Sequence, residues 1–218
     1  MTDSEVRGEA EENAAFVLAL RERGVRDTDV LRAMERVPRE RFVPARHRAQ
    51  ARRDLALPLP CGQTMTAPTV VAAMLTALGV RPGARVLEVG AGSGYATALL
   101  LRLGAAHVLS LERYRTLAED ALASLGGESG AVIEIGDGLA GPPRPERFDR
   151  ILVNGTLAAF PAPLLDALTP QGRLVGALGA AGKCRLTVVE RDAGGRVVER
   201  LGSPIRVTPL TPGRAEVF

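Results

Sequence analysis

A glycine-rich turn is the part of the sequence whose residue types and spacing point most directly to chemistry. It reads Glu88-Val89-Gly90-Ala91-Gly92-Ser93-Gly94 and follows the apolar run Arg85–Val89, which predicts a short strand. Glycines at alternate positions let the backbone approach a ligand closely before a helix begins. A dinucleotide fingerprint requires a third glycine where Tyr95 stands, so the spacing disfavours that cofactor class. The turn predicts a nucleotide-like cofactor, and a tight strand-to-helix turn without a ligand is the alternative.

Two acidic residues further along the chain sharpen this prediction. Glu112 ends the predicted strand 107–111, about twenty residues past the loop, where a carboxylate can accept both ribose hydroxyls of a nucleoside. Asp137 follows the predicted strand 132–135, and an acid there can accept a hydrogen bond from an adenine amino group. The spacing Gly-x-Gly-x-Gly, with an acid two residues ahead, is the first motif of the class I methyltransferases. Together these features predict S-adenosylmethionine (SAM) as the cofactor.

The expected cofactor site contains the loop and the ends of the next two strands. We assign to it Glu88, Gly90, Ala91, Gly92, Gly94, Glu112, Arg113, Asp137 and Gly138. No metal site is expected, because His47 and His107 are too far apart in sequence to suggest a pair of ligands.

The elements that position these residues alternate between strands and helices. This alternation predicts an α/β fold with a mostly parallel, twisted sheet and helices on both faces. Two N-terminal helices precede this pattern as an extension, and a β-hairpin around Ala193-Gly194-Gly195 follows it. Residues 1–218 are expected to form a single domain, with the helices and substrate-side segment in 1–80 and the cofactor core in 81–218. The expected helices are 5–23, 27–36, 69–78, 94–103, 116–125 and 163–168; the expected strands are 85–89, 107–111, 132–135, 148–154, 173–178, 185–191 and 196–207.

The composition and charge of the chain disfavour two classes of binding partner, nucleic acids and membranes. The net charge is only +3, and the densest arginine cluster, 46–53, contains no aromatic residue, so we expect no nucleic-acid partner. The acidic N-terminus lacks the features of a signal peptide, and no apolar run approaches the roughly 20 residues of a membrane span. Two cysteines form no disulfide framework. These features predict a cytoplasmic protein without a membrane partner; the sequence leaves the oligomeric state open, with a monomer favoured.

The chain resembles the protein-L-isoaspartate O-methyltransferase family over about residues 30–210. The segments that carry the resemblance are Val37-Pro38-Arg39-Glu40-Arg41-Phe42-Val43, Gly62-Gln63-Thr64-Met65-Thr66-Ala67-Pro68, the run from Val86 to Thr97, Gly136-Asp137-Gly138 and Arg206-Val207-Thr208-Pro209-Leu210. The first two are fairly specific to this family, because methyltransferases at large share only the glycine loop. The resemblance implies a Rossmann-like class I methyltransferase fold.

The resemblance also implies a reaction: methyl transfer from SAM to the α-carboxylate of an L-isoaspartyl residue in a damaged protein. A carboxylate is ionised at pH 7, so the transfer needs no strong base, only in-line placement and exclusion of water. Short hydroxyls can provide that placement, and we expect Thr64 and Thr66 to be catalytic. The alternative for either threonine is a cap on the helix beginning near Thr69. Gln63, Asn154 and Arg206 are expected to bind the peptide or protein substrate.

The sequence departs from the family pattern on the substrate side. Where the family typically has a Val-Thr-Ala-Ala type of segment, this chain has Val153-Asn154-Gly155-Thr156-Leu157. Two alternatives to isoaspartyl methylation therefore stay open: a related methyltransferase with another peptide or small carboxylate acceptor, and a non-catalytic SAM-binding module.

Overall fold

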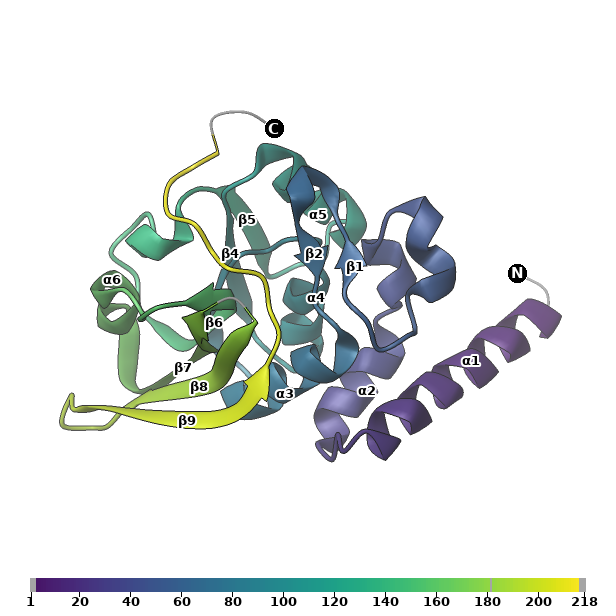
Figure 1. Ribbon diagram of the computed structural model, residues 1–218, viewed down its shortest axis with the longest axis horizontal. Helices are drawn as coiled ribbons and strands as arrows, with labels where there is room; N and C mark the ends of the chain where they lie inside the picture. The colour runs from purple at the N-terminus through teal and green to yellow at the C-terminus, as the bar shows by residue number, and fades with distance from the viewer. Residues whose placement is uncertain (1–2, 181, 216–218) are drawn as a thin grey trace.

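Short runs of Val, Leu and Ile form a central sheet whose strands follow the order β5-β4-β3-β6-β7-β8-β9 in the computed structural model, which describes residues 3–180 and 182–215 (Figure 1). The strands from β5 to β7 are parallel, as expected from the alternation of strands and helices. Their bounds are β3 (Arg85–Val89), β4 (His107–Glu112), β5 (Ala131–Ile135), β6 (Phe148–Leu157) and β7 (Leu168–Ala180).

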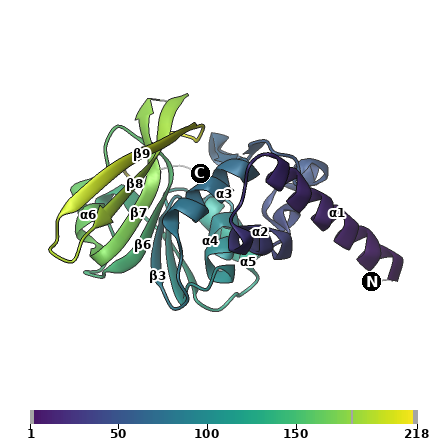
Figure 2. The same cartoon turned by 90° about the horizontal axis from the view of Figure 1, so that it is seen from below.

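Helices cover both faces of the sheet, but unequally (Figure 2). On one face α3, α4 and α5 pack against Val86, Val108 and Leu152. On the other face α6 and the short 3₁₀ helix η4 (Gly138–Ala140) pack against Leu87, Leu109 and Ile151. The bounds are α3 (Pro68–Leu78), α4 (Tyr95–Arg102), α5 (Arg115–Leu125) and α6 (Ala162–Asp166). The expected α/β class and two-faced covering are confirmed, and the second face is thinner because only η4 lies between β5 and β6.

The C-terminal strands extend the sheet in the antiparallel sense. The predicted hairpin is present as β8 (Lys183–Arg191) and β9 (Val197–Ile205). The sequence pattern did not predict that β7 also pairs antiparallel with β8, so that β7, β8 and β9 form a meander at one edge. β7 is longer than expected at both ends, because Leu168 pairs with Phe148 of β6 and the ladder with β8 continues to Ala180.

The N-terminal extension consists of α1 (Asp3–Glu22) and α2 (Thr28–Arg36), beside the core helices (Figure 2). The Asp27 side chain accepts hydrogen bonds from the backbone N–H groups of Asp29 and Val30 and is therefore the N-cap of α2. Val30, Leu31 and Met34 are buried on one face of α2, as their helical spacing predicts. None of the helices in the described ranges is long and apolar enough to cross a membrane.

The segment between α2 and α3 has more structure than its prolines suggest. It forms the 3₁₀ helices η1 (Arg39–Phe42) and η2 (Ala45–Gln50), and then a small antiparallel hairpin. The hairpin pairs β1 (Leu57–Pro58) with β2 (Thr64–Met65), and the short helix η3 (Pro60–Gly62) forms its tip. Sequence periodicity cannot detect two-residue strands, so the sequence pattern does not predict this hairpin.

Candidate active site

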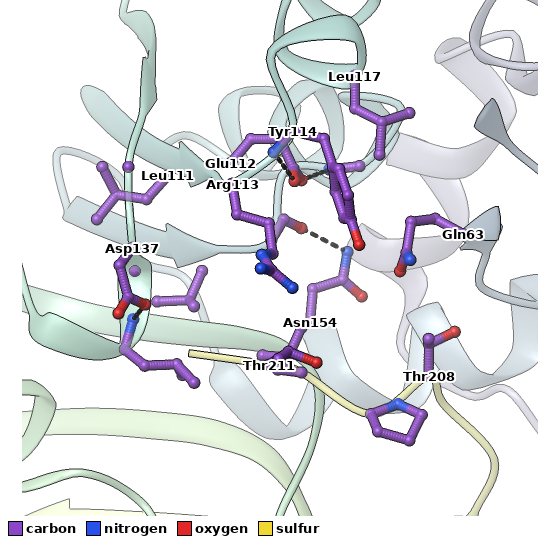
Figure 3. A pocket seen from close by; sticks show the side chains of 18 of the residues that line it. Gln63, Leu111, Glu112, Arg113, Tyr114, Leu117, Asp137, Asn154, Thr208 and Thr211 are labelled. Carbon is purple, nitrogen blue, oxygen red and sulfur yellow. Dashed lines mark hydrogen bonds between the residues drawn. The ribbon is translucent and has the colours of Figure 1, made fainter. Parts of the chain in front are cut away.

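A pocket opens at the carboxyl ends of β3, β4, β5 and β6, the edge at which parallel α/β sheets place ligands (Figure 3). The glycine loop and the ends of β4 and β5 form one side. The β1–β2 hairpin, Asn154 and the tail segment after β9 form the other. The lining residues are 63, 64, 66, 89, 90, 92, 111–114, 117, 136–139, 154 and 208–211.

The glycine loop needs glycine at its three alternate positions. Gly90, Gly92 and Gly94 have φ values of 86°, 55° and 83°, in the left-handed region that glycine adopts without strain. The backbone N–H groups of Gly90 and Ala91 donate to the Leu111 carbonyl oxygen, at 2.8 and 3.4 Å. These bonds fix the loop against the end of β4, so it is preorganised around the pocket.

Glu112 is held in place by two backbone donors. Its Oε2 accepts from Gly92 N at 2.8 Å and its Oε1 accepts from Tyr114 N at 3.0 Å. A carboxylate oxygen can accept more than one hydrogen bond, so both oxygens keep acceptor capacity toward the pocket. Glu112 lines the pocket and is only 4% exposed, so this acceptor capacity is available at a nearly buried position.

Glu88 lies behind the loop and does not line the pocket. Its Oε2 accepts hydrogen bonds from the hydroxyls of Thr97 (2.6 Å) and Ser110, while its Oε1 has no partner. Burial raises the pKa of Glu88 to about 7; the hydroxyl donors oppose this rise and Glu112 adds to it. Glu88 therefore connects β3, β4 and α4 beneath the glycine loop.

Asp137 binds the chain's own tail. Its Oδ1 accepts from Leu139 N at 3.0 Å, and its Oδ2 accepts from Gly213 N at 2.7 Å. Arg113 Nε donates to the Gly213 carbonyl at 3.0 Å, and Ala215 N donates to the Arg113 carbonyl. Beside Asp137, an added Cβ on Gly138 would stand 2.6 Å from Val89 Cγ1, so the backbone there requires glycine. The ends of β4 and β5 thus hold the tail across the pocket.

The two threonines expected to be catalytic both line the pocket. Thr64 Oγ1 lies 2.7 Å from Thr208 Oγ1, which joins the β1–β2 hairpin to the tail. The N-cap of α3 is Ala67, which has no side-chain capping bond, so the alternative role of either threonine as a helix cap is wrong. Their hydroxyls have no structural task in α3.

The divergent segment at the end of β6 brings the tail to the pocket. Asn154 Nδ2 donates to the Gly90 carbonyl at 3.2 Å, and Thr156 exchanges backbone hydrogen bonds with Thr208 and Leu210. An added Cβ on Gly155 would stand 2.5 Å from Leu210 Cγ and 2.8 Å from the Thr208 carbonyl oxygen. Gly155 is therefore a requirement for close packing of the tail. β6 passes its expected end because Thr156 and Leu157 pair with Ala177 and Leu178 of β7.

The structure brings most of the expected site residues into one pocket. The pocket is lined by Gln63, Thr64, Thr66, Gly90, Gly92, Glu112, Arg113, Asp137, Gly138 and Asn154. Glu88, Ala91 and Gly94 do not line it and instead support the loop, with Gly94 packed against Ala121. Arg206 lies elsewhere, in a groove of about 970 Å³ between α3 and the β8–β9 edge.

Sequence reasoning missed Tyr114, Leu139 and Thr208–Thr211 as pocket residues. The tail could have been found in part, because Thr208 and Leu210 belong to a segment already matched to the family. Tyr114 and Leu139 carry no local signal; they line the pocket because each follows a strand that ends there.

Comparison with known proteins agrees with this geometry. The family model described as protein-L-isoaspartate(D-aspartate) O-methyltransferase matches residues 11–215. Protein-L-isoaspartate O-methyltransferase 2 of Rhodopseudomonas palustris is 47% identical over 207 residues, covering 94% of each chain. The protein-L-isoaspartate O-methyltransferase of Xanthobacter autotrophicus is 44% identical over 218 residues, covering 99% of each chain.

A solved structure shares the fold. It is a Plasmodium falciparum protein assigned to the protein-L-isoaspartate O-methyltransferases, in complex with S-adenosyl-L-homocysteine (SAH). The TM-score is 0.80 at 21% identity, with 90% of this chain and 97% of that chain covered.

Proposed function

The chain belongs to the protein-L-isoaspartate(D-aspartate) O-methyltransferase family, and from that premise we propose that it methylates the α-carboxylate of L-isoaspartyl residues in proteins. The observation that carries this proposal is that a single pocket contains both halves of the site. The glycine loop and Glu112 line it on one side, and the paired hydroxyls of Thr64 and Thr208 line it on the other. The methyl ester would collapse to a succinimide, which can reopen as normal aspartate, so the reaction repairs damaged protein.

The cofactor side of the pocket fits SAM through its donor set. Glu112 would hold the ribose, and Gly90 and Gly92 would leave room for the backbone to approach the cofactor. Asp137 keeps acceptor capacity for an adenine amino group because each of its oxygens accepts one hydrogen bond. When bound, SAM would supply a methyl group on a positively charged sulfur, which is already activated for transfer.

The acceptor side offers short polar groups and no strong base. We assign orientation of the carboxylate to the hydroxyls of Thr64 and Thr66, with Gln63 and Asn154 contacting the substrate peptide. A carboxylate oxygen would form the new bond to the methyl carbon as the carbon–sulfur bond breaks, and no proton needs to move. Positioning of this kind can lower the barrier by roughly 7–11 kcal/mol. An acceptor side built from these polar groups, without an acid–base pair among its described residues, is therefore compatible with catalysis.

The two sides of the pocket come from different parts of the chain. We assign the acceptor side to the segment within residues 1–80 together with Asn154, and the cofactor side to the rest of 81–218, with the tail contributing to both. A cytoplasmic location and a monomeric state stay predictions; cell fractionation and sedimentation would test them.

The test is methyl transfer from isotope-labelled SAM to an isoaspartyl peptide and to its aspartyl twin. We expect label in the isoaspartyl peptide alone, followed by release of labelled methanol as the ester collapses. SAH binding without transfer to the isoaspartyl peptide would refute repair and favour another carboxylate acceptor. Failure to bind SAH at all would refute the cofactor assignment.

A further inference from the structure

Arg39 is a buried cation outside the pocket that the reaction described above does not use. It lies in η1, is only 1% exposed, and no ion pair in the described part of the chain includes it. Its guanidinium instead donates to three backbone carbonyls: Ala51 at 2.5 Å, Leu55 at 3.3 Å and Thr66 at 3.0 Å. Burial lowers the pKa of Arg39 to about 10, so the group stays charged at neutral pH. A buried charge is unfavourable, so it requires these bonds.

Two of the three carbonyls lie at the base of the β1–β2 hairpin. Leu55 stands just before β1 and Thr66 just after β2, so the guanidinium joins the two ends of the hairpin. Strands of two residues have little stability of their own, and a lone hairpin is marginal in water. The position of Gln63 and Thr64 in the pocket therefore depends on contacts made by the rest of the chain.

The same guanidinium contacts the element that follows the glycine loop. Arg39 Cζ lies 5.9 Å from the centroid of the Tyr95 ring, within the range of a cation–π contact. Tyr95 is the first residue of α4, directly after Gly94, and is 2% exposed. Its hydroxyl and Arg39 Nε are buried atoms without a hydrogen-bond partner. Arg39 thus lies between the base of the acceptor hairpin and the helix that begins at the cofactor loop.

We propose that Arg39 is a positioning residue that fixes the acceptor hairpin relative to the cofactor loop through the carbonyls of Leu55 and Thr66 and the ring of Tyr95. This inference rests on the proposed function, because it assigns Thr64 and Thr66 to the acceptor side. Methyl transfer depends on placement, and small displacements of the acceptor reduce turnover steeply. Arg39 therefore acts on kcat and leaves cofactor binding unchanged, since Glu112 and the glycine loop are held by separate bonds.

The test compares Arg39→Lys with a matched control, Arg150→Lys. Lysine keeps the charge but cannot hold three carbonyls with one planar fork. Arg150 is also buried and also donates to backbone carbonyls, those of Gly79 and Asp149, but lies near the start of β6, away from the pocket. We expect kcat for the isoaspartyl peptide to fall roughly 10- to 100-fold in Arg39→Lys only. The dissociation constant of SAH stays within about threefold of wild type in both variants.

Hydrogen exchange provides a readout that does not depend on turnover. Amides 63–66 should exchange at least about tenfold faster in Arg39→Lys, while those of 90–94 keep their wild-type rates. Wild-type inactivity toward the peptide would refute the proposed function and leave this exchange test in force.

Equal loss of kcat in both lysine variants, or a parallel loss of SAH affinity in Arg39→Lys, would overturn the role of Arg39. Wild-type exchange rates at 63–66 would overturn it as well. Arg39→Gln, a neutral planar donor, is measured in the same way if Arg39→Lys unfolds. If neither Arg39 variant folds while Arg150→Lys does, Arg39 serves stability alone and the proposal is wrong.

Discussion

The two sides of the pocket are built by different means. The cofactor side consists of the ends of three adjacent parallel strands, and backbone hydrogen bonds hold its loop, Glu112 and Asp137. The acceptor side is assembled from segments far apart in the chain, namely the β1–β2 hairpin, the end of β6 and the tail. Backbone hydrogen bonds of Thr156 join the tail to β6, whereas single side-chain contacts, such as Thr64 with Thr208 and Arg39 with the Thr66 carbonyl, hold the hairpin.

This difference predicts that cofactor binding and turnover depend on different parts of the molecule. Hydrogen bonds between neighbouring segments of the sheet edge hold the cofactor side in place. Substitutions in other parts of the chain should therefore have little effect on cofactor binding. The acceptor side depends on a few tertiary contacts, so single substitutions there should alter turnover while cofactor binding persists. Variants on each side test whether cofactor binding and turnover can be changed separately.

The largest effect is expected for Glu112→Ala. It removes the carboxylate that we assign to both ribose hydroxyls and that also holds Gly92 N. Loss of two charge-assisted hydrogen bonds costs roughly 3 kcal/mol or more, which corresponds to at least a hundredfold weaker SAH binding by calorimetry. Glu134→Ala is the control, because Glu134 pairs with Arg144 and does not line the pocket. Unchanged affinity in Glu112→Ala would refute the ribose assignment.

The next effect is a dependence of the free energy of unfolding on pH, caused by Glu88 on the cofactor side. The pKa of Glu88 is about 7 in the folded protein and lies near 4.3 in an unfolded chain, so the folded state binds more protons between these values. The free energy of unfolding therefore decreases as pH rises from about 4.3 through 7, by roughly 3–4 kcal/mol. The extra stability is fully present below the lower value and lost above the upper one.

Glu88→Gln should remove this slope and be the more stable protein at pH 8. Chemical denaturation of the cofactor-free protein across this range measures it, with Glu119→Gln as the control because Glu119 is exposed on α5. If the free energy of unfolding had the same pH dependence in Glu88→Gln and wild type, the raised pKa of Glu88 would be refuted.

A smaller effect, of roughly 2 kcal/mol in the barrier, is expected on the acceptor side from Gly155→Ala. The added methyl group meets Leu210 and the Thr208 carbonyl and must displace the tail. We expect kcat/KM for the isoaspartyl peptide to fall roughly 30-fold, with a much smaller change in SAH affinity. Gly194→Ala, in the turn between β8 and β9, is the control because its Cβ has space. A larger loss of SAH affinity than of turnover would break the separation of the two sides.

The smallest effect is expected for Thr64→Val. Valine keeps the shape but removes the hydroxyl that contacts Thr208 and that we assign to the acceptor carboxylate. A hydrogen bond from a hydroxyl to a charged carboxylate contributes about 1.5 kcal/mol, so kcat/KM should fall about tenfold, and Thr64→Ser should restore it. A double-mutant cycle with Thr208→Val separates the two contacts of this hydroxyl. Full activity in Thr64→Val would remove Thr64 from the acceptor side.

The same contrast explains what could be predicted from the sequence. Strand β3, the glycine loop and Glu112 lie within one stretch of chain, so local spacing was enough to predict them. The hairpin of β1 and β2 could not be predicted, because its strands have only two residues and depend on Arg39 at their base. Gly155 lies in the segment that departs from the family pattern. Its close approach to Leu210 joins residues 55 positions apart, so no local sequence pattern predicts it.

Hydrogen exchange on the wild-type protein tests the central claim most directly: the hairpin and tail form the acceptor side of a SAM-binding pocket. SAH alone should protect amides of 90–94 and 112–114. Adding an isoaspartyl peptide to the SAH-bound protein should then protect 63–66 and 208–211, and its aspartyl twin should not. Protection of neither acceptor segment by the isoaspartyl peptide, or equal protection by both peptides, would contradict the account.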